Sequence, residues 1–299
     1  MKVIKKIIKS CLPYGIISLH KSIKQKGKHE KILKILRKDY ASIISDYKDH
    51  QNIAPTTTSI LPYPIWVCWW QGETAMPEIV KMCYTQLKKK ANGHTINLIT
   101  KNNYQDFISL PENIQGKLHK GKITLTNLSD IIRVVLLSQY GGLWIDSTIY
   151  VLHNLPNFDM DLFSIRQLRD FDYVPECRWS SNLLYASKSH LLFSFLRDIF
   201  FNYLKENDRF IDYFFLDYCI ALAYENIPEI KKDIDNIPFT NPNFHWLRNN
   251  LNRKYEQLSF LELARTTQFC KLTYKRKYEE KTEDGFLTYY GYIKNEAKN

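Results

Sequence analysis

The sequence predicts an α/β fold in which a mostly parallel sheet is flanked by helices, with a helical N-terminal arm and a helix-rich C-terminal half. Between residues 60 and 150, short apolar segments alternate with segments of helical period. This alternation is typical of parallel strands that are joined by crossover helices. After residue 189 the helical period dominates. A hydrophobic content of 44% and an aromatic content of 14% exclude a disordered chain.

The first segment, residues 1–38, is a basic arm. It contains twelve Lys or Arg residues and one acidic residue, Glu30, so it carries the whole net charge of +11 and the rest of the chain is neutral. Apolar residues from Val3 to Leu12 recur on one helical face, lysines occupy the other, and a shorter apolar pattern follows at residues 32–36. Such a helix fits an anionic membrane surface, where each lysine contributes about 1 kcal/mol.

Two other interpretations of the arm stay open. Its apolar face could pack on the protein's own domain or on a partner protein, and its charge could attract nucleic acid. The neutral remainder of the chain and the few aromatic residues of the arm argue against nucleic acid. The arm lacks the unbroken apolar core of a signal peptide, and no stretch approaches the roughly twenty apolar residues of a membrane span.

Residues 40–60 are predicted to be a polar connector, which divides the chain into an arm at 1–50 and one domain at 60–299. In that domain, residues 65–70 are the first predicted strand, 77–90 a helix that begins with Pro77 and ends in lysines, and 95–100 the second strand. Short helical pieces follow at 101–122. Beyond the centre of the chain, strands are predicted at 149–152, 163–165 and 182–185, and helices at 190–205, 211–226 and 250–263.

The central helix and strand are the most informative part of the chain. A nearly all-apolar helix at 126–140 carries Asp130 and Arg133 on one side, and it ends at two glycines that suit the left-handed turn after a helix. The short strand that follows ends in Asp146. Charges inside such a helix need partners, and the carboxyl ends of strands are where α/β sheets bind ligands. The three charged side chains are therefore predicted to converge on a ligand site.

This segment resembles the signature of glycosyltransferases with the GT-A fold, and more closely that of glycosyltransferase family 32 and the capsular polysaccharide synthesis proteins. The pattern is Ser-Asp-x-x-Arg at residues 129–133, Tyr-Gly-Gly at 140–142, and a strand that ends in Asp-x-Thr at 146–148. Weaker matches follow the same order at 64–72, at Trp179 with Asn182, and at 269–274. The resemblance covers residues 60–275 and implies a GT-A-like domain that transfers a sugar from a nucleotide-sugar donor with retention of configuration.

The resemblance also implies roles for individual residues. Asp130 and Arg133 would grip the sugar hydroxyls, and Asp146 would contact the nucleotide ribose or bind Mn²⁺ or Mg²⁺. The wider family has a second Asp where this chain has Thr148, whose hydroxyl is a poorer ligand for a hard cation and would hold a metal-bound water or a phosphate oxygen. The structural alternatives are an ion pair within the helix and a turn stabilised by Asp146.

On the donor side, Trp69 aligns best with the aromatic residue that stacks on the nucleotide base in the relatives, and such stacking contributes roughly 1–3 kcal/mol. Trp66 and Trp70 compete for this role, and core packing is the alternative for each. Asn182 would hydrogen-bond the donor, or else it occupies a turn. Lys271 would neutralise the phosphates if the metal is weak or absent, or else it is a solvated lysine at a strand edge.

On the acceptor side, Asp217 and Trp246 are the candidate residues. Asp217 lies in an aromatic helix, where its carboxylate could face the acceptor or pair with a Lys or Tyr. The predicted catalytic residues are Asp130, Arg133 and Asp146. No general base is assigned, because in retaining transfer of this type the leaving phosphate can take the acceptor proton.

The predicted function is therefore transfer of a sugar, most simply from a UDP-sugar, to a growing capsular or exopolysaccharide repeat unit. The expected partners are the nucleotide-sugar donor, a lipid-linked glycan acceptor and, through residues 1–38, an anionic membrane surface; nucleic acid is not expected. The six cysteines include no Cys-x-x-Cys pair, which favours reduced core residues over a zinc site. A cytoplasmic protein on the inner face of the membrane is expected.

Three other functions stay open. Thr148 permits a sugar-nucleotide or glycan-binding protein without turnover. A glycoside hydrolase would need a pair of carboxylates, whereas only Asp146 is placed clearly at a strand end and no second carboxylate has a defined place. A nucleic-acid-binding protein that works through the arm is the third alternative.

Overall fold

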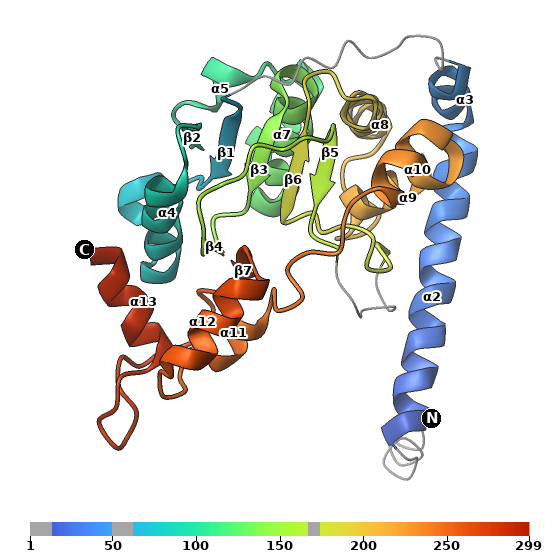
Figure 1. Cartoon of the computed structure of the whole chain (residues 1–299). Helices are drawn as coiled ribbons and strands as arrows, with labels where there is room; N and C mark the ends of the chain where they lie inside the picture. Colours follow the sequence, from blue (N-terminus) through green and yellow to red (C-terminus); the bar gives the residue numbers. More distant parts are fainter. Residues whose placement is uncertain (1–13, 50–61, 167–173, 299) are drawn as a thin grey trace.

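A five-stranded sheet is the centre of the molecule in the computed structural model, which describes residues 14–49, 62–166 and 174–298 (Figure 1). Its order is β2 (Thr95–Ile99), β1 (Pro64–Cys68), β3 (Gly142–Ile145), β6 (Leu183–Ala186) and β5 (Leu162–Ser164). β1 pairs in parallel with β2 and β3, whereas β6 is antiparallel to both β3 and β5. Four strands thus share one direction, which confirms the predicted mostly parallel sheet.

Core residues pack on both faces of the sheet, and the strands β1, β3 and β6 are accordingly apolar, whereas the edge strand β2 is only partly buried. Successive residues point to opposite faces of a strand. Trp66 and Trp144 accordingly lie in the core cluster on one face, and Ile65 and Leu143 lie in the cluster on the other. The first face is packed by α7 (Leu125–Tyr140) and α8 (Leu191–Glu206), and the second partly by α4 (Glu78–Lys90).

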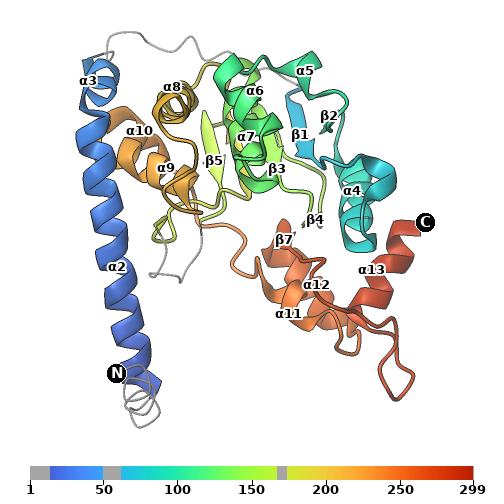
Figure 2. The same cartoon turned by 180° about the vertical axis from the view of Figure 1, so that it is seen from behind.

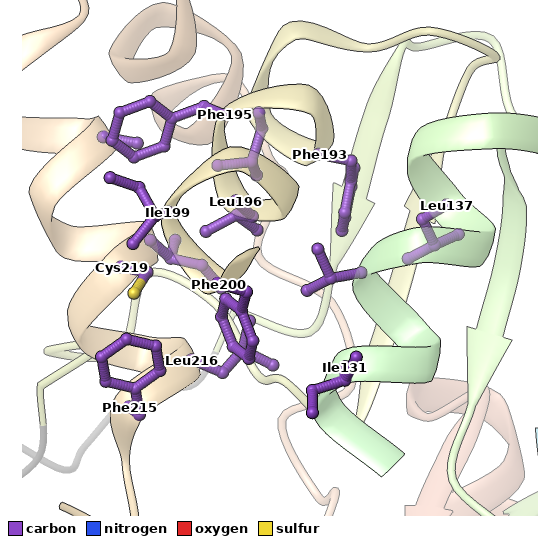
Figure 3. Close-up of a cluster of buried hydrophobic side chains, with 14 of the residues drawn as sticks. Ile131, Leu137, Phe193, Phe195, Leu196, Ile199, Phe200, Phe215, Leu216 and Cys219 are labelled. Carbon is purple, nitrogen blue, oxygen red and sulfur yellow. The ribbon is translucent and has the colours of Figure 1, made fainter. Parts of the chain in front are cut away.

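The larger cluster holds α7, α8 and α9 (Phe215–Asn226) together (Figure 3). Phe193, Phe200 and Phe215 are fully buried there, and Ile131 of α7 faces them. Burial of a side chain of this size contributes about 2 kcal/mol. This packing fixes the second turn of α7, which carries Asp130, and the first turn of α9, which carries Asp217.

The turn between α7 and β3 depends on Gly141 and Gly142, which have φ angles of 66° and 92°. A Cβ on Gly142 would lie 2.2 Å from the carbonyl oxygen of Pro64, so β3 can approach β1 only because this residue has no side chain. The predicted glycine turn at the end of the helix is confirmed. The turn sets the direction of β3, so Asp146 lies at the carboxyl end of that strand.

The N-terminal arm contains α2 (Tyr14–Asp39) and α3 (Ala41–Asp49), so residues 41–49 are a helix and not the predicted polar connector. The reason is an apolar stripe at helical spacing: Leu36, Tyr40 and Ile44 are buried in the main core. α2 packs on α9 and α3 on α8, and Figure 2 shows α2 at the edge of the molecule. For residues 25–49, the structure thus bears out packing on the protein's own domain. The apolar pattern at residues 3–12 lies outside the described residues.

The C-terminal half adds a two-stranded sheet of β4 (Ile149–Val151) and β7 (Phe269–Lys271). The predicted helix at 250–263 is wrong: α11 (Trp246–Asn250) and α12 (Gln257–Thr266) are separate, and α9 begins at Phe215 rather than at 211. The other helical elements are η1 (Glu73–Ala75), α5 (Tyr104–Phe107), α6 (Glu112–His119), α10 (Pro228–Asp235) and α13 (Tyr289–Lys298). In the described ranges, no helix is long and apolar enough to cross a membrane.

Candidate active site

A cavity of about 560 Å³ opens where β1 and β3 end at their carboxyl ends. Its wall comes from the residues after β1 and β3, the N-terminal half of α7, the turn before β6, the start of α9, and β7 with the loop that follows it. Of the predicted residues, it is lined by Trp69, Asp130, Arg133, Asp146, Thr148, Asn182, Asp217 and Lys271. The position is the one at which open α/β sheets bind ligands.

Asp146 is the hub of a charged cluster in this cavity. Its Oδ1 accepts hydrogen bonds from Trp144 Nε1 at 3.0 Å and from Arg133 Nη2 at 3.1 Å, and its Oδ2 accepts one from Lys271 Nζ at 2.7 Å. Burial alone would raise the pKa of Asp146, but the positive charges of Lys271 and Arg133 outweigh burial and hold the pKa below its usual range. Asp146 is therefore ionised and has a cation on each oxygen.

Arg133 connects Asp146 to Asp130. It is 5% exposed, and its Nη1 donates to the Ser181 carbonyl at 2.7 Å and lies 3.4 Å from Asp130 Oδ1. Its guanidinium also lies 4.7 Å from the centre of the Trp144 ring. The predicted ion pair within the helix exists, but it belongs to a network that includes Asp146, Trp144 and Lys271.

Asp130 and Asp217 have the opposite electrostatic behaviour to Asp146. Burial raises the pKa of Asp130 to about 7 and that of Asp217 to about 6. Asp217 accepts a hydrogen bond from Trp179 Nε1 at 3.0 Å and is thus held by an indole rather than by a Lys or Tyr. The structure therefore places a second and a third carboxylate in the cavity with Asp146. A glycoside hydrolase needs such a pair of carboxylates, and the sequence alone gave a defined place only to Asp146.

The raised pKa values predict how stability depends on pH. The folded state keeps a proton on Asp130 up to about pH 7, whereas the unfolded chain loses it near the ordinary value of 3.8. The ionisation of Asp130 therefore weakens folding as the pH rises from about 4 to about 7.

Asp130→Asn imitates the protonated form and removes this dependence. Its melting temperature relative to the wild type is expected to rise by roughly 5–10 °C between pH 5 and pH 8, because the two pH units below a pKa of about 7 correspond to about 3 kcal/mol. Thermal unfolding followed by circular dichroism measures it, with the exposed Asp159→Asn as control. Parallel curves for the wild type and Asp130→Asn would contradict the prediction.

Two of the three candidate tryptophans reach the cavity. Trp66 is 3% exposed in the core and donates to the Gly141 carbonyl at 2.8 Å, so it is excluded from base stacking. Trp69 and Trp70 both line the cavity. Trp69 meets Tyr274 edge to face at a centroid distance of 5.6 Å, and Trp70 lies against Tyr104.

The polar candidates are also in place. Thr148 is 8% exposed, and Asn182 lies in the turn before β6, where its side chain donates to Ser180 Oγ at 2.9 Å. Lys271 is not a solvated lysine, because its side chain is 17% exposed and pairs with Asp146.

Trp246, like Trp66, does not line the cavity. It begins α11 and packs edge to face on Tyr289 at a centroid distance of 5.2 Å. The acceptor-side assignment of Trp246 is therefore dropped. The sequence analysis missed Tyr213, Tyr274 and Lys275, which do line the cavity. Residues 274–276 form a bend after β7, so no strand or helix period in the sequence marked Lys275 as a lining residue.

The residues present fit the expected Mn²⁺ or Mg²⁺ poorly. Hard cations bind several oxygen ligands, carboxylates foremost. Both oxygens of Asp146 are engaged by cationic donors, and Thr148 offers only a hydroxyl. Within the ranges that the structure describes, no group of three His, Cys, Asp or Glu residues could hold a metal. We therefore assign no step to a metal.

Comparisons with known proteins place this geometry in a family. Residues 14–293 match the model of the family described as "Capsular polysaccharide synthesis protein". No match was found among curated proteins. Among solved structures, the "PaToxG Glycosyltransferase" is similar with 14% identity and a TM-score of 0.41, over 69% of this chain and 83% of that one, which is too distant to support a conclusion. Because the family model spans nearly the whole chain, the protein belongs to the capsular polysaccharide synthesis protein family.

Proposed function

We propose that the protein is a glycosyltransferase that moves a sugar from a nucleotide-sugar donor, most simply a UDP-sugar, to a growing capsular polysaccharide. The observation that carries this proposal is the cluster of Asp130, Arg133, Asp146 and Lys271 at the end of the sheet, inside a cavity with an indole in its wall. It combines groups for a sugar, a diphosphate and a flat base. Membership of the family supports a role in capsule synthesis.

The sugar would be bound between the N-terminal half of α7 and the first turn of α9. Asp130, with its pKa near 7, exists in both protonation states at neutral pH and can donate or accept a hydrogen bond to a hydroxyl. Arg133 is held by three acceptors and so keeps a fixed orientation. Rigid groups of this kind lower the entropic cost of orienting a substrate.

The transfer step is proposed with retention of configuration. The bond between the anomeric carbon and the diphosphate oxygen breaks, a bond to the acceptor hydroxyl oxygen forms on the same face, and the acceptor proton goes to the departing phosphate. Cations near the diphosphate offset the charge that develops on it. Asp217, together with the 67% exposed Tyr213, is proposed to border the acceptor.

The acceptor is proposed to be a glycan on a lipid carrier at the inner face of the membrane, with the protein on the cytoplasmic side. The basic composition of residues 1–38 supports this proposal. Exposed basic residues continue along α2 at Lys26, Lys31 and Lys34.

Calorimetric titration of the full chain with UDP, GDP, CMP and their sugars tests the function. One nucleotide family is expected to bind with micromolar affinity, and its sugar is expected to be consumed when a glycan acceptor is added. Either Trp69→Ala or Trp70→Ala is expected to weaken binding by roughly tenfold or more, which identifies the stacking indole. Failure of every nucleotide to bind would reject the proposal.

A second candidate is a sugar-nucleotide or glycan-binding protein without turnover. It is favoured by Thr148 in place of a carboxylate. Tight donor binding without consumption of the donor, in the presence of varied acceptors, would support it.

The three carboxylates around the cavity are also compatible with a glycoside hydrolase, which needs a pair of carboxylates. Against it, both oxygens of Asp146 are bound by cationic side chains. Release of nitrophenol from a nitrophenyl glycoside without any nucleotide would support the hydrolase.

A further inference from the structure

We propose that Lys271 replaces a divalent metal in this site: its ammonium group binds the diphosphate of the donor, and donor binding needs no metal. The inference rests on the proposed function and specifies how the same site neutralises phosphate. Three observations carry it, namely the anchoring of the Lys271 backbone, the donors left on its ammonium group, and the lack of a metal-binding donor set.

The Lys271 backbone is fixed on both sides. In the pairing of β4 with β7, Lys271 stands opposite Ile149, and its N–H donates to the Phe244 carbonyl at 2.8 Å. The next residue, Leu272, donates to the Thr148 carbonyl at 2.8 Å. These bonds hold the start of the lysine side chain beside the Asp-x-Thr segment at 146–148. The register of this small sheet therefore brings the ammonium group of Lys271 to the carboxylate of Asp146.

The ammonium group has donors to spare. Lys271 Nζ donates to Asp146 Oδ2 at 2.7 Å, and this is its one recorded bond within the described part of the chain. An ammonium group has three N–H donors, so two are available to a ligand in the cavity that Lys271 lines. Arg133 is shared between Asp146 and Asp130, whereas Lys271 pairs with Asp146, so the ammonium group is the cation of this cluster with donors left for a diphosphate.

The same contacts disfavour a metal at this point. A divalent ion bound to Asp146 would need Oδ2, which Lys271 occupies, and it would lie beside two positive charges that repel it. Thr148 adds only a hydroxyl. Lys271 therefore supplies a positive charge at the position where the resemblance implies a bound divalent metal ion.

The test is calorimetric titration of the full-length protein with UDP and with uridine, in EDTA and in MnCl₂; GDP and guanosine take their place if those bind better. The wild type is expected to bind UDP in EDTA, with an affinity that MnCl₂ changes less than threefold. Lys271→Gln is expected to lose roughly tenfold to hundredfold in UDP affinity and to keep its uridine affinity, because uridine has no phosphate.

Two further variants complete the design. Lys277→Gln removes a lysine of the same segment that is 89% exposed and should leave both affinities unchanged. Lys271→Arg keeps the charge and should retain most of the UDP affinity, which separates charge from folding if Lys271→Gln proves unstable.

The outcomes separate this inference from the proposed function. Binding of UDP that disappears in EDTA would overturn the role of Lys271 and leave the glycosyltransferase intact. Equal losses for UDP and uridine in Lys271→Gln would also overturn it, since they would indicate a structural role. Binding of CMP alone would overturn the diphosphate assignment, and failure of all nucleotides to bind would remove the proposed function itself.

Discussion

Asp146→Asn is expected to reduce sugar transfer by a hundredfold or more and to lower the stability of the protein. The substitution removes the negative charge that holds Arg133 and Lys271, and it leaves both cations facing a neutral amide. Removal of one partner from a buried charge network lowers the free energy of unfolding by on the order of 3 kcal/mol. The loss of activity is larger than this instability implies, because the groups that bind sugar and diphosphate lose their common anchor.

The measurement combines donor consumption at a temperature well below the melting point with thermal unfolding. Asp159→Asn is the matched control, because Asp159 is exposed and lies outside the cavity. A variant that keeps wild-type turnover would show that the cluster is structural and would remove the observation on which the proposed function depends.

Gly142→Ala is expected to have the largest effect on folding of any single methyl addition considered in this chain. The new Cβ would lie 2.2 Å from the Pro64 carbonyl oxygen and 2.7 Å from its Cγ, at a φ of 92°. The carbonyl oxygen cannot yield without separating β1 from β3, and the Cγ belongs to the rigid ring of Pro64. A left-handed conformation alone costs about 1–3 kcal/mol, and the clash adds to it, so the variant should be largely insoluble or unfolded at 37 °C.

Gly93→Ala is the matched control for this prediction. Gly93 has a φ of 84°, but an added Cβ would meet no atom within 4 Å. It should therefore cost about 1 kcal/mol of stability and leave the fold intact. Denaturant unfolding and soluble yield compare the two variants. Equal losses of stability in both variants would show that the left-handed backbone conformation, and not the close approach of β3 to β1, requires glycine at position 142.

The elements with strong periodicity could be predicted from the sequence. The strands at β1, β2 and β3 and the helices α4, α7 and α8 lie within a few residues of their predicted bounds. The strands β1 and β3 are apolar runs covered on both faces, and the three helices carry apolar residues at helical spacing. The resemblance located Asp130, Arg133 and Asp146, and the structure brings them together. Their roles in transfer stay predictions.

Other features could not be predicted because they depend on contacts between distant segments. Asp146 and Lys271 are 125 residues apart, and nothing near either residue specifies the other. The helix at 41–49 was hidden by its polar composition, because only its buried stripe on the core distinguishes it from a connector. Trp246 looked like a ligand contact because of its residue type, whereas Tyr289 of α13 covers it.

The pairing of β4 with β7 has a consequence for synthesis of the protein. The last charged group of the cluster, Lys271, is translated 125 residues after Asp146, so a nascent chain on the ribosome carries Asp146 first without it. Contacts of such high sequence separation form late, after local helices and neighbouring strands. The order of translation thus delays assembly of the charged cavity until β7 has been synthesised, and a chain that terminates between the two residues would carry Asp146 without its ammonium partner.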